Sequence, residues 1–459
     1  PARILHPGSE GLRFSPPRLR RIAGAAALLV SAAAMSILAL QGGPKILGFG
    51  AAGAVIAGFS LLVPWLAVGV AAGFRGCGPL AKLSSDHLVR SLHRNAVTIA
   101  ALSAAVAMAI SVTVMIHSFR ASVQRWIDHT LTADMYIAPA VNEVAGLQAF
   151  LPSGAAAWAA GQSGVDGIAT FRELSVRFRG EPVSLAVIDG KARGDIAFVG
   201  SDPAAAAERF SSGETVAVSE SFATRFGLAG PREIRLPTAQ GEADFAVSGI
   251  YRDFSRDRGT ILMPRSLFEK HWADERIHSL ALQIGKNGDA GAVAAAFRAK
   301  YGAQGEYSIY DNAALRERVF QIFNQTFAVT AALRVIAIFV AVAGVLFALS
   351  VLVIEREREI GVLRAIGASR LQVLRVFLGE ALIIGLSASL SGVACGAVLA
   401  MVLTWVVNKA FFGWTIALSY PFLTLAATPL WLIPAALIAA LFPAWKAANV
   451  RPARAVRFE

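Results

Sequence analysis

Long apolar stretches with few charges constrain this chain more than any other feature. A helix of about 20 apolar residues crosses the hydrocarbon core of a bilayer, which is roughly 30 Å thick. Backbone polar groups inside lipid must bond within the protein, so such stretches are restricted to helices. The sequence predicts spans at 22–40, 46–74, 96–116, 335–354 (within an apolar segment that starts near 329), 381–407 and 423–442.

The stretch between the third and fourth predicted spans has a different composition. Of all 459 residues, 55% are hydrophobic and 16% are charged, against roughly 25% charged in soluble domains. Residues 120–322 nevertheless hold charges, glycines and short alternating runs, and this stretch is long enough for a core of its own. Strands are predicted at 133–137, 174–179, 183–188, 233–236 and 245–251, a strand running into a helix at 215–226, and a helix at 292–301. Gly180-Glu181-Pro182 is predicted to turn a hairpin.

The fold class that follows is an α-helical membrane protein with six transmembrane helices plus an α+β extracytoplasmic domain. Short segments rich in Lys and Arg mark the cytoplasmic side, whereas the turns at 41–45 and 408–422 hold only Lys45 and Lys409. Both termini are therefore expected in the cytoplasm. The expected order is a cytoplasmic segment 1–21, two spans in 22–74, a cytoplasmic loop 75–95, a span with an outward stalk at 96–118, an extracytoplasmic domain 120–322, and a three-span domain 323–459 with a cytoplasmic segment 355–375.

The net charge of +12 could suggest a nucleic acid partner. No patch combines basic and aromatic residues, and many basic residues flank predicted spans. We therefore expect a membrane lipid environment and no nucleic acid partner.

The most unusual stretch is the charge cluster 355–370, which directly follows the fourth predicted span. An ordinary cytoplasmic loop needs only basic residues, yet Glu355, Glu357 and Glu359 alternate with arginines. Ile360, Leu363, Ile366 and Leu374 then follow at helical spacing, which predicts an amphipathic helix on the membrane surface with one face open to a soluble partner. A plain positive-inside loop is the alternative.

Three segments of this region resemble a known family. They resemble segments of the FtsX-like/MacB-like permeases of ABC transporters. The first is Glu-Arg-Glu-Arg-Glu-Ile-Gly-Val-Leu-Arg-Ala-Ile-Gly-Ala-Ser at 355–369, and the second is Phe-Leu-Gly-Glu-Ala at 377–381. The third is Phe-Pro-Ala-Trp-Lys-Ala-Ala at 442–448, followed by Arg-Pro-Ala-Arg-Ala-Val-Arg at 451–457. The order of parts from 96 to 459 is also similar. Gln-Thr-Phe at 325–327 and Phe-Gly-Trp-Thr at 412–415 resemble the long members, which have two such repeats and ten spans.

The resemblance implies a function and a docking surface. Such permeases pair with a separate cytoplasmic ABC ATPase, in dimeric form, which binds ATP and Mg. The motion driven by the ATPase is passed to the outside domain, for export or extraction of a lipid, lipoprotein or hydrophobic compound in a bacterial cell inner membrane. The ATPase-coupling interface is then expected at Glu355, Arg356, Glu357, Arg358, Glu359, Gly361, Arg364, Gly367, Ala368, Ser369 and Arg370.

Two other functions stay open. The same motion could activate an external enzyme or sensor without transport, or 120–322 could hold the active site of a membrane enzyme. The sequence has no Gly-x-x-x-x-Gly-Lys-Ser/Thr loop to cradle phosphate and no Gly-x-Ser-x-Gly elbow, so it predicts neither ATP hydrolysis nor catalysis by this chain alone. The histidines and cysteines lack metal-ligand spacing, and Cys77 and Cys395 are not expected to form a disulfide.

The two spans in 22–74 depart from a single-repeat permease, which has four spans. The start Pro-Ala-Arg-Ile-Leu echoes Pro-Ala-Arg-Ala-Val at 452–456, which suggests the C-terminal half of a two-repeat permease. The partners expected within the membrane are then a first permease repeat or a second permease copy.

Small-residue spacings and one carboxylate inside the predicted spans complete the set of candidates. Gly69-x-x-x-Gly73 and Gly392-x-x-x-Gly396 could each let two helices pack closely, although alanine-rich spans produce such spacing often. Glu380 lies where the fifth span begins, and an interfacial pairing with Arg375 or water is preferred over a functional role in the membrane.

Overall fold

A computed structural model describes residues 19–449 apart from several gaps. The gaps are 143–147, 191–194, 229–231, 287 and most positions between 322 and 356, where only 325, 332, 335, 336, 339, 343, 346, 347, 350, 351 and 354 are described. The chain divides into two compact units. The helical unit comprises Pro1–His117, Val329–Val407 and Leu418–Glu459, and the sheet unit comprises Ser118–Ala328 and Asn408–Ala417.

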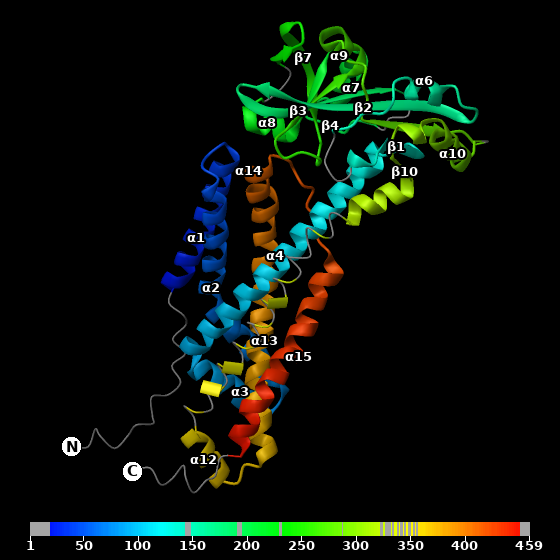
Figure 1. The fold of residues 1–459 in the computed structure, drawn as a ribbon. Helices are drawn as coiled ribbons and strands as arrows, with labels where there is room; N and C mark the ends of the chain where they lie inside the picture. The colour runs from blue at the N-terminus through cyan, green and yellow to red at the C-terminus, as the bar shows by residue number, and fades with distance from the viewer. Residues whose placement is uncertain are drawn as a thin grey trace. The chain divides into compact units, whose positions relative to one another are not determined.

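Long apolar helices make up the helical unit (Figure 1). Its helices are α1 (Leu19–Leu40), α2 (Ile46–Phe74), α3 (Pro79–Arg90), α4 (Leu92–Thr130, entering the sheet unit), α12 (Glu357–Ala365), α13 (Arg370–Met401) and α15 (Phe422–Ala448).

Four helices in the described part of the chain are long and apolar enough to cross a membrane. They cover Arg20–Leu40, Ile46–Cys77, Leu92–Thr130 and Arg370–Phe412, and a shorter apolar helix covers Ile433–Ala448. The fourth predicted span falls largely outside the described residues, although the positions described between 332 and 354 are helical. The structure therefore supports four spanning helices, and the count of six stays a prediction.

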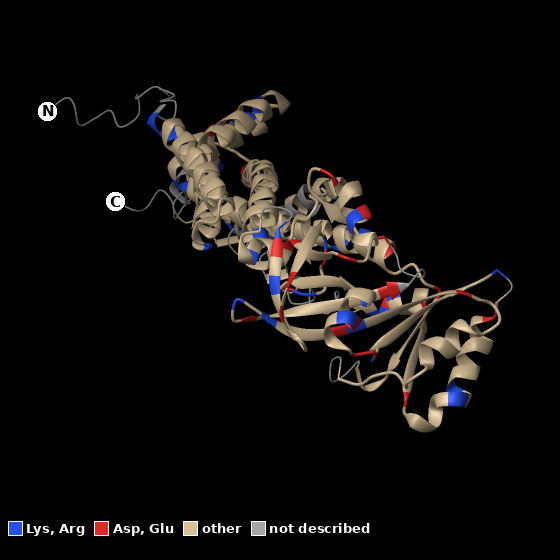
Figure 2. Cartoon of the chain, turned by 90° about the horizontal axis from the view of Figure 1, so that it is seen from above, with Lys and Arg blue, Asp and Glu red and all other residues tan. Residues whose placement is uncertain are grey.

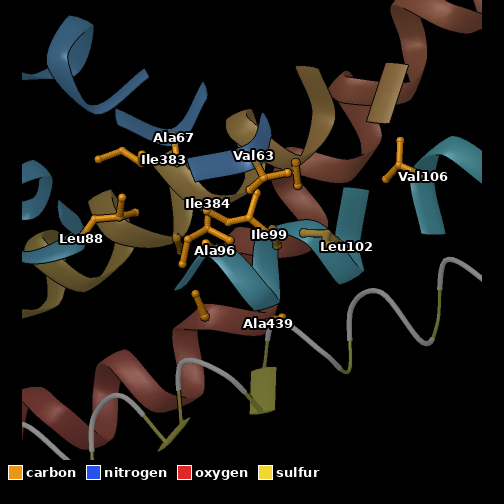
Figure 3. Packing of buried hydrophobic residues seen from close by; sticks show 14 of the residues in the cluster. Val63, Ala67, Leu88, Ala96, Ile99, Leu102, Val106, Ile383, Ile384 and Ala439 are labelled. Atoms are coloured by element: carbon orange, nitrogen blue, oxygen red, sulfur yellow. The ribbon is translucent and has the colours of Figure 1, made fainter. Parts of the chain in front are cut away.

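Buried side chains from several helices form the core of the helical unit (Figure 3). Val63 and Ala67 of α2, Ile99 and Leu102 of α4, and Ile384 of α13 are among its buried side chains. Leu88 of α3 and Ala439 of α15 belong to the same core. Many contacts involve alanine, which brings helix backbones close together where no water is present to drive association.

The first two helices pack as a hairpin, α1 beside α2 (Figure 1). Small and branched residues of this hairpin join a cluster with Cys395 and Leu399 of α13 and with Val402 and Val406. The hairpin is thus an integral part of the helical unit.

Residues 75–95 contain more structure than the predicted loop. Gly78 has φ +129° and starts α3, whose first residue is Pro79, a favoured first helical position because its missing N–H would have no partner there. Leu88 is fully buried, and α3 packs against α2 and α13. The sequence prediction missed α3 because the stretch is short and mixes polar with apolar residues.

The sheet unit is built on a single mixed sheet. In its described residues this sheet has ten strands in the order β10-β1-β9-β2-β3-β8-β5-β7-β4, with β6 paired to β7. The pairs β3–β8 and β5–β7 are parallel and the others are antiparallel. The strands are β1 (Met135–Pro139), β2 (Val165–Phe178), β3 (Glu181–Gly190), β4 (Phe198–Val199), β5 (Val216–Ser219), β6 (Glu233–Thr238), β7 (Gly241–Tyr251), β8 (Thr260–Pro264), β9 (Ser279–Ile284) and β10 (Tyr307–Asp311).

Helices cover this sheet around three clusters of buried side chains. Phe222 and Phe268 anchor a cluster over the central strands, and Phe297 anchors another over β1, β2 and β9. Phe210 lies in a smaller cluster near β4. The covering helices are α6 (Ala155–Ala160), α7 (Pro203–Ser211), α8 (Glu220–Phe226), α9 (Arg265–Trp272) and α10 (Ala290–Tyr301). Charged side chains are scattered over this unit (Figure 2).

The predicted hairpin at 174–188 exists, but its turn lies elsewhere. Arg179 (φ 51°) and Gly180 (φ 82°) are the two turn residues, and Glu181 and Pro182 already belong to β3. Two successive positive φ values are typical of the type I′ turn, whose twist matches that of the flanking strands. The sequence prediction placed the turn one residue too late because it followed the proline.

Candidate functional site

The candidate site is the bend between α12 and α13, which we call the elbow (residues 357–377). Helix α12 ends at Ala365, and Gly367 follows with a φ of +106°, which lies in the region that favours glycine. The Gly367 N–H donates to the Arg364 carbonyl (3.2 Å), and the Ala368 N–H donates to the Leu363 carbonyl (3.0 Å). These two bonds form a Schellman motif, which satisfies carbonyls at the helix end.

Helix α13 begins immediately after that motif with a capping box. The Gln372 N–H donates to Ser369 Oγ (3.2 Å), and the Ser369 N–H donates to Gln372 Oε1 (2.8 Å). Arg364 Nη1 also donates to the Ala368 carbonyl (3.0 Å). With a helix stop joined directly to a helix start, the angle of the elbow is fixed by local hydrogen bonds.

The apolar residues of α12 do not form a single face on a membrane surface. Ile360 is 2% exposed and packs against Val373 and Phe377 of α13. Ala444 and Ala447 of α15 belong to the same cluster. The interpretation as a surface helix is therefore wrong for Ile360, because tertiary packing recruits it into the protein core.

The outer side of the elbow presents a different set of side chains. Ile366 is 80% exposed and Val362 is 45% exposed, while Arg370 and Arg375 are also exposed. An exposed apolar residue flanked by arginines suits a partner that combines an apolar surface with acidic groups.

An apolar cavity of about 220 Å³ lies between α3 and the elbow. Its lining residues come from α3 and from the elbow, whose part includes the first turns of α13. They are Leu80, Leu83, His87, Ile360, Leu363, Ala368, Gln372, Val373, Val376 and Phe377.

Helix α3 buttresses the elbow through a close contact with α13. Ser84 Oγ donates to the Val376 carbonyl (3.0 Å), and a Cβ added at Gly379 would lie 2.5 Å from that same Ser84 Oγ. His87 Nδ1 lies 3.1 Å from Glu380 Oε1, and the Glu380 side chain is 1% exposed. The sequence prediction considered Arg375 or water for Glu380 and missed His87, which is remote in the chain.

The predicted coupling residues fall into three groups. Glu355 and Arg356 lie outside the described residues, and Glu357, Arg358 and Glu359 belong to α12 without described side chains. Gly361 is buried, and Arg364 and Ala368 are half-buried. Gly367, Ser369 and Arg370 are exposed at the elbow.

The segments that carried the family resemblance meet at this place. Ile360, Phe377 and Ala444 come from the three separate motifs and share one buried cluster. Among the described residues, no group of three or more His, Cys, Asp or Glu side chains could hold a metal ion.

Comparisons with known proteins agree with this arrangement. Residues 331–452 match the FtsX-like permease C-terminal domain, and residues 96–300 match the MacB-like periplasmic core domain. The ABC transporter permease protein Rv0987 of Mycobacterium tuberculosis is 30% identical over 388 residues, covering 83% of this chain and 45% of that protein.

Two further relatives match shorter parts of the chain. The lipoprotein-releasing system transmembrane protein LolC of Xylella fastidiosa is 30% identical, over 24% of this chain and 29% of that protein. The macrolide export ATP-binding/permease protein MacB of Bdellovibrio bacteriovorus is 26% identical, over 35% of this chain and 24% of that protein. The chain thus spans less than half the length of each of these relatives.

Proposed function

Because the chain belongs to the FtsX-like/MacB-like family of ABC transporter permeases, we propose that it couples ATP hydrolysis by a separate cytoplasmic ABC ATPase to motion of its sheet unit outside the cytoplasm. The elbow is the observation that carries this proposal. It joins two helices through a Schellman motif and a capping box. Because these hydrogen bonds fix the angle between the helices, a displacement of α12 also moves α13.

The contact surface of the ATPase is proposed to cover the outer side of the elbow. Ile366 supplies the apolar anchor, and Arg370 and Arg375 supply charges that attract acidic groups. The sequence has no phosphate-cradling loop, so ATP and Mg bind in the partner.

The cargo is proposed to be a lipid, a lipoprotein or another hydrophobic compound. Two relatives are named for lipoprotein release and for macrolide export, and both kinds of molecule carry large apolar surfaces. The chain is proposed to lie in a bacterial inner membrane with both termini in the cytoplasm, as the basic residues beside its spans indicate.

The decisive experiment measures ATPase stimulation by a variant of the elbow and by a matched variant of another glycine turn. Gly367→Asp places a side chain at φ +106°, which opens the elbow and abolishes stimulation of the partner ATPase in reconstituted vesicles. Glu359→Lys, at the predicted interface, is expected to do the same.

Gly42→Asp is the control. Gly42 has φ +93° and, like Gly367, open space around its missing Cβ, but it lies in the turn between α1 and α2. Stimulation is expected to persist in Gly42→Asp. Normal stimulation by a membrane-inserted Gly367→Asp protein would refute the role of the elbow.

A further inference from the structure

The segment Asn408–Ala417, which we call the strap, belongs to the sheet unit although both of its neighbours in the chain belong to the helical unit. It begins with the short helix α14 (Asn408–Phe412) and continues without regular structure from 413. From its composition, this part of 408–422 is expected to be no more than a turn between two spans. Its contacts show that it is instead bound to the sheet unit along its length.

Side chains of the sheet unit bind the backbone of the strap at every second residue. Thr224 and Glu220 of α8 and Ser122 of α4 provide these bonds. Thr224 Oγ1 donates to the Gly413 carbonyl (2.9 Å), the Thr415 N–H donates to Glu220 Oε2 (3.1 Å), and the Ala417 N–H donates to Ser122 Oγ (3.2 Å).

The intervening side chains of the strap are buried. Trp414 is 7% exposed and Ile416 is 1% exposed, and both pack with Val123, Ile127 and Phe254. The ring centroids of Trp414 and Phe254 are 5.8 Å apart in an edge-to-face arrangement, a favourable geometry for aromatic pairs. The alternation of bound backbone and buried side chain resembles a strand held by side chains in place of a neighbouring strand.

Gly413 allows the strap to lie directly on α8. Its φ is +80°, and a Cβ added there would lie 2.8 Å from the Cα of Ser221, a backbone atom that cannot rotate away. Only glycine satisfies both the conformation and the approach.

A π-helix, Val402–Val407, precedes the strap directly. Such wide turns interrupt the regular hydrogen bonding of a helix and are frequent at functional sites. This π-helix forms the whole connection between the end of α13 and the start of the strap.

We propose that the strap stays docked on the sheet unit throughout the transport cycle. It thereby links the C-terminal end of α13 and the N-terminal end of α15 to the sheet unit. Release would expose Trp414 and Ile416 to water and leave three backbone groups to find new partners, which makes a permanent tether the favoured behaviour. The chain motion that the tether requires is taken up in the π-helix. The docking itself is independent of the proposed function, whereas its consequence for coupling rests on that function.

Docking is tested by thiol labelling of Ile416→Cys in a Cys77→Ser background, in full-length protein in vesicles. A water-soluble maleimide is expected to label residue 416 at least tenfold more slowly than an exposed reference, Ser201→Cys, both without nucleotide and while a partner ATPase hydrolyses ATP. Adding Trp414→Ala is expected to raise the labelling rate about tenfold. Fast labelling of residue 416 in the intact protein, or only during ATP hydrolysis, would overturn the permanent tether.

Coupling is tested by locking the strap. The pair Ser122→Cys and Ala417→Cys is expected to form a disulfide on oxidation, and the locked protein is expected to stimulate the ATPase within twofold of the reduced one. Loss of stimulation on locking would mean that the strap must be released, and would contradict the proposal.

Weakening the contact between the strap and the sheet unit is expected to reduce ATPase stimulation, whereas locking that contact is expected to preserve it. Trp414→Ala is expected to lower stimulation at least tenfold, and Phe422→Ala, an exposed aromatic residue at the start of α15, is expected to leave it unchanged. Unchanged stimulation in a Trp414→Ala protein that labels rapidly at residue 416 would overturn the role in coupling. If the unmodified protein stimulates no ATPase, the proposed function fails, and the labelling result still decides whether the strap is docked.

Discussion

At the scale of single residues, two identical spacings of glycine have different roles. A Cβ added at Gly392 would lie 2.6 Å from Val106 Cγ1, and one at Gly396 would lie 3.0 Å from the Ala107 carbonyl oxygen, so α13 packs directly on α4 there. Gly69 and Gly73 have no atom within 4 Å of the added position. The glycine spacing predicted a close helix contact equally for both pairs. Within this chain, only the pair Gly392 and Gly396 makes such a contact.

We therefore predict different costs for the same substitution. Gly396→Leu forces α13 away from α4 and is expected to reduce the free energy of unfolding by about 1–3 kcal/mol, the usual cost of overpacking. Gly73→Leu is expected to change it by less than about 0.5 kcal/mol, as is usual for exposed positions. Denaturation of the two variants in one mild detergent measures the difference, and equal losses would contradict the contact between α13 and α4.

A buried histidine in the sheet unit has an unusual environment. His278 is 1% exposed, accepts the Glu173 N–H at Nδ1 (3.1 Å), and has Arg172 Nη1 2.9 Å from Nε2. Burial, reinforced by the positive Arg172, lowers the pKa of His278 from 6.5 to about 4. Asp274 pairs with Arg172 (2.9 Å) and Arg276 also faces this cluster, so a second positive charge on the ring is poorly accommodated.

This environment predicts loss of stability in acid. The unfolded chain binds a proton at His278 below about pH 6.5, whereas the folded chain binds it only near pH 4. The contribution of neutral His278 to the free energy of unfolding is therefore fully present above pH 6.5. This contribution is lost as the pH falls toward 4. The loss is at most about 3 kcal/mol, at 1.36 kcal/mol per pH unit.

Chemical denaturation of the full chain between pH 7 and pH 4 measures this dependence. His278→Gln removes the titrating group and is expected to flatten the curve in that window. The carboxyl of Asp274, whose pKa is lowered mainly by its hydrogen bond to Arg276, titrates below the window and does not confuse the comparison. An equally steep curve for His278→Gln would assign the dependence to other groups.

At the scale of elements, the elbow depends on its two helix ends and on α3. The Gly367 turn and the Ser369 cap are local, whereas the close contact between Ser84 and Gly379 comes from a helix remote in the chain. Helix α3 thereby supports the first turns of α13 through a surface remote in the sequence.

Loss of the cap is expected to loosen the start of α13. Ser369→Ala removes the acceptor for the Gln372 N–H and costs about 1 kcal/mol, which corresponds to about fivefold faster hydrogen exchange in the first turn of α13. Ser369→Asp retains an acceptor at the cap and is expected to exchange at the original rate. Hydrogen exchange with mass spectrometry on peptides that cover 369–377 provides the measurement, and identical rates in the two variants would count against the capping box.

At the scale of the whole molecule, the native cysteines report the orientation of the chain. Cys77 is exposed in the predicted cytoplasmic loop 75–95, and Cys395 is buried in α13. A membrane-impermeant maleimide is expected to label Cys77 in inverted vesicles and not in intact spheroplasts, and to leave Cys395 unmodified in both.

Ser201→Cys in the sheet unit supplies the complementary site. It is exposed and is expected to react in intact spheroplasts only. Labelling of Cys77 from outside would reverse the predicted orientation of every span.

The sequence by itself determined the class of this protein. Apolar runs longer than about 20 residues leave helices as the only option in lipid, and an interruption by a charged, glycine-containing stretch indicates a separate domain. Local patterns also sufficed where bonds are local, as at β5 and α8 within 215–226, and at α10. The FtsX-like motif at 355–369 likewise identified the elbow as the candidate site.

Tertiary structure alone decided which residues far apart in the chain come into contact. Burial of Ile360, pairing of His87 with Glu380, and docking of Trp414 on the sheet unit all join residues far apart in the chain. No periodicity encodes such contacts, because they depend on which surfaces the folded helices and strands bring within reach. For the same reason one Gly-x-x-x-Gly spacing became a helix contact and the other did not.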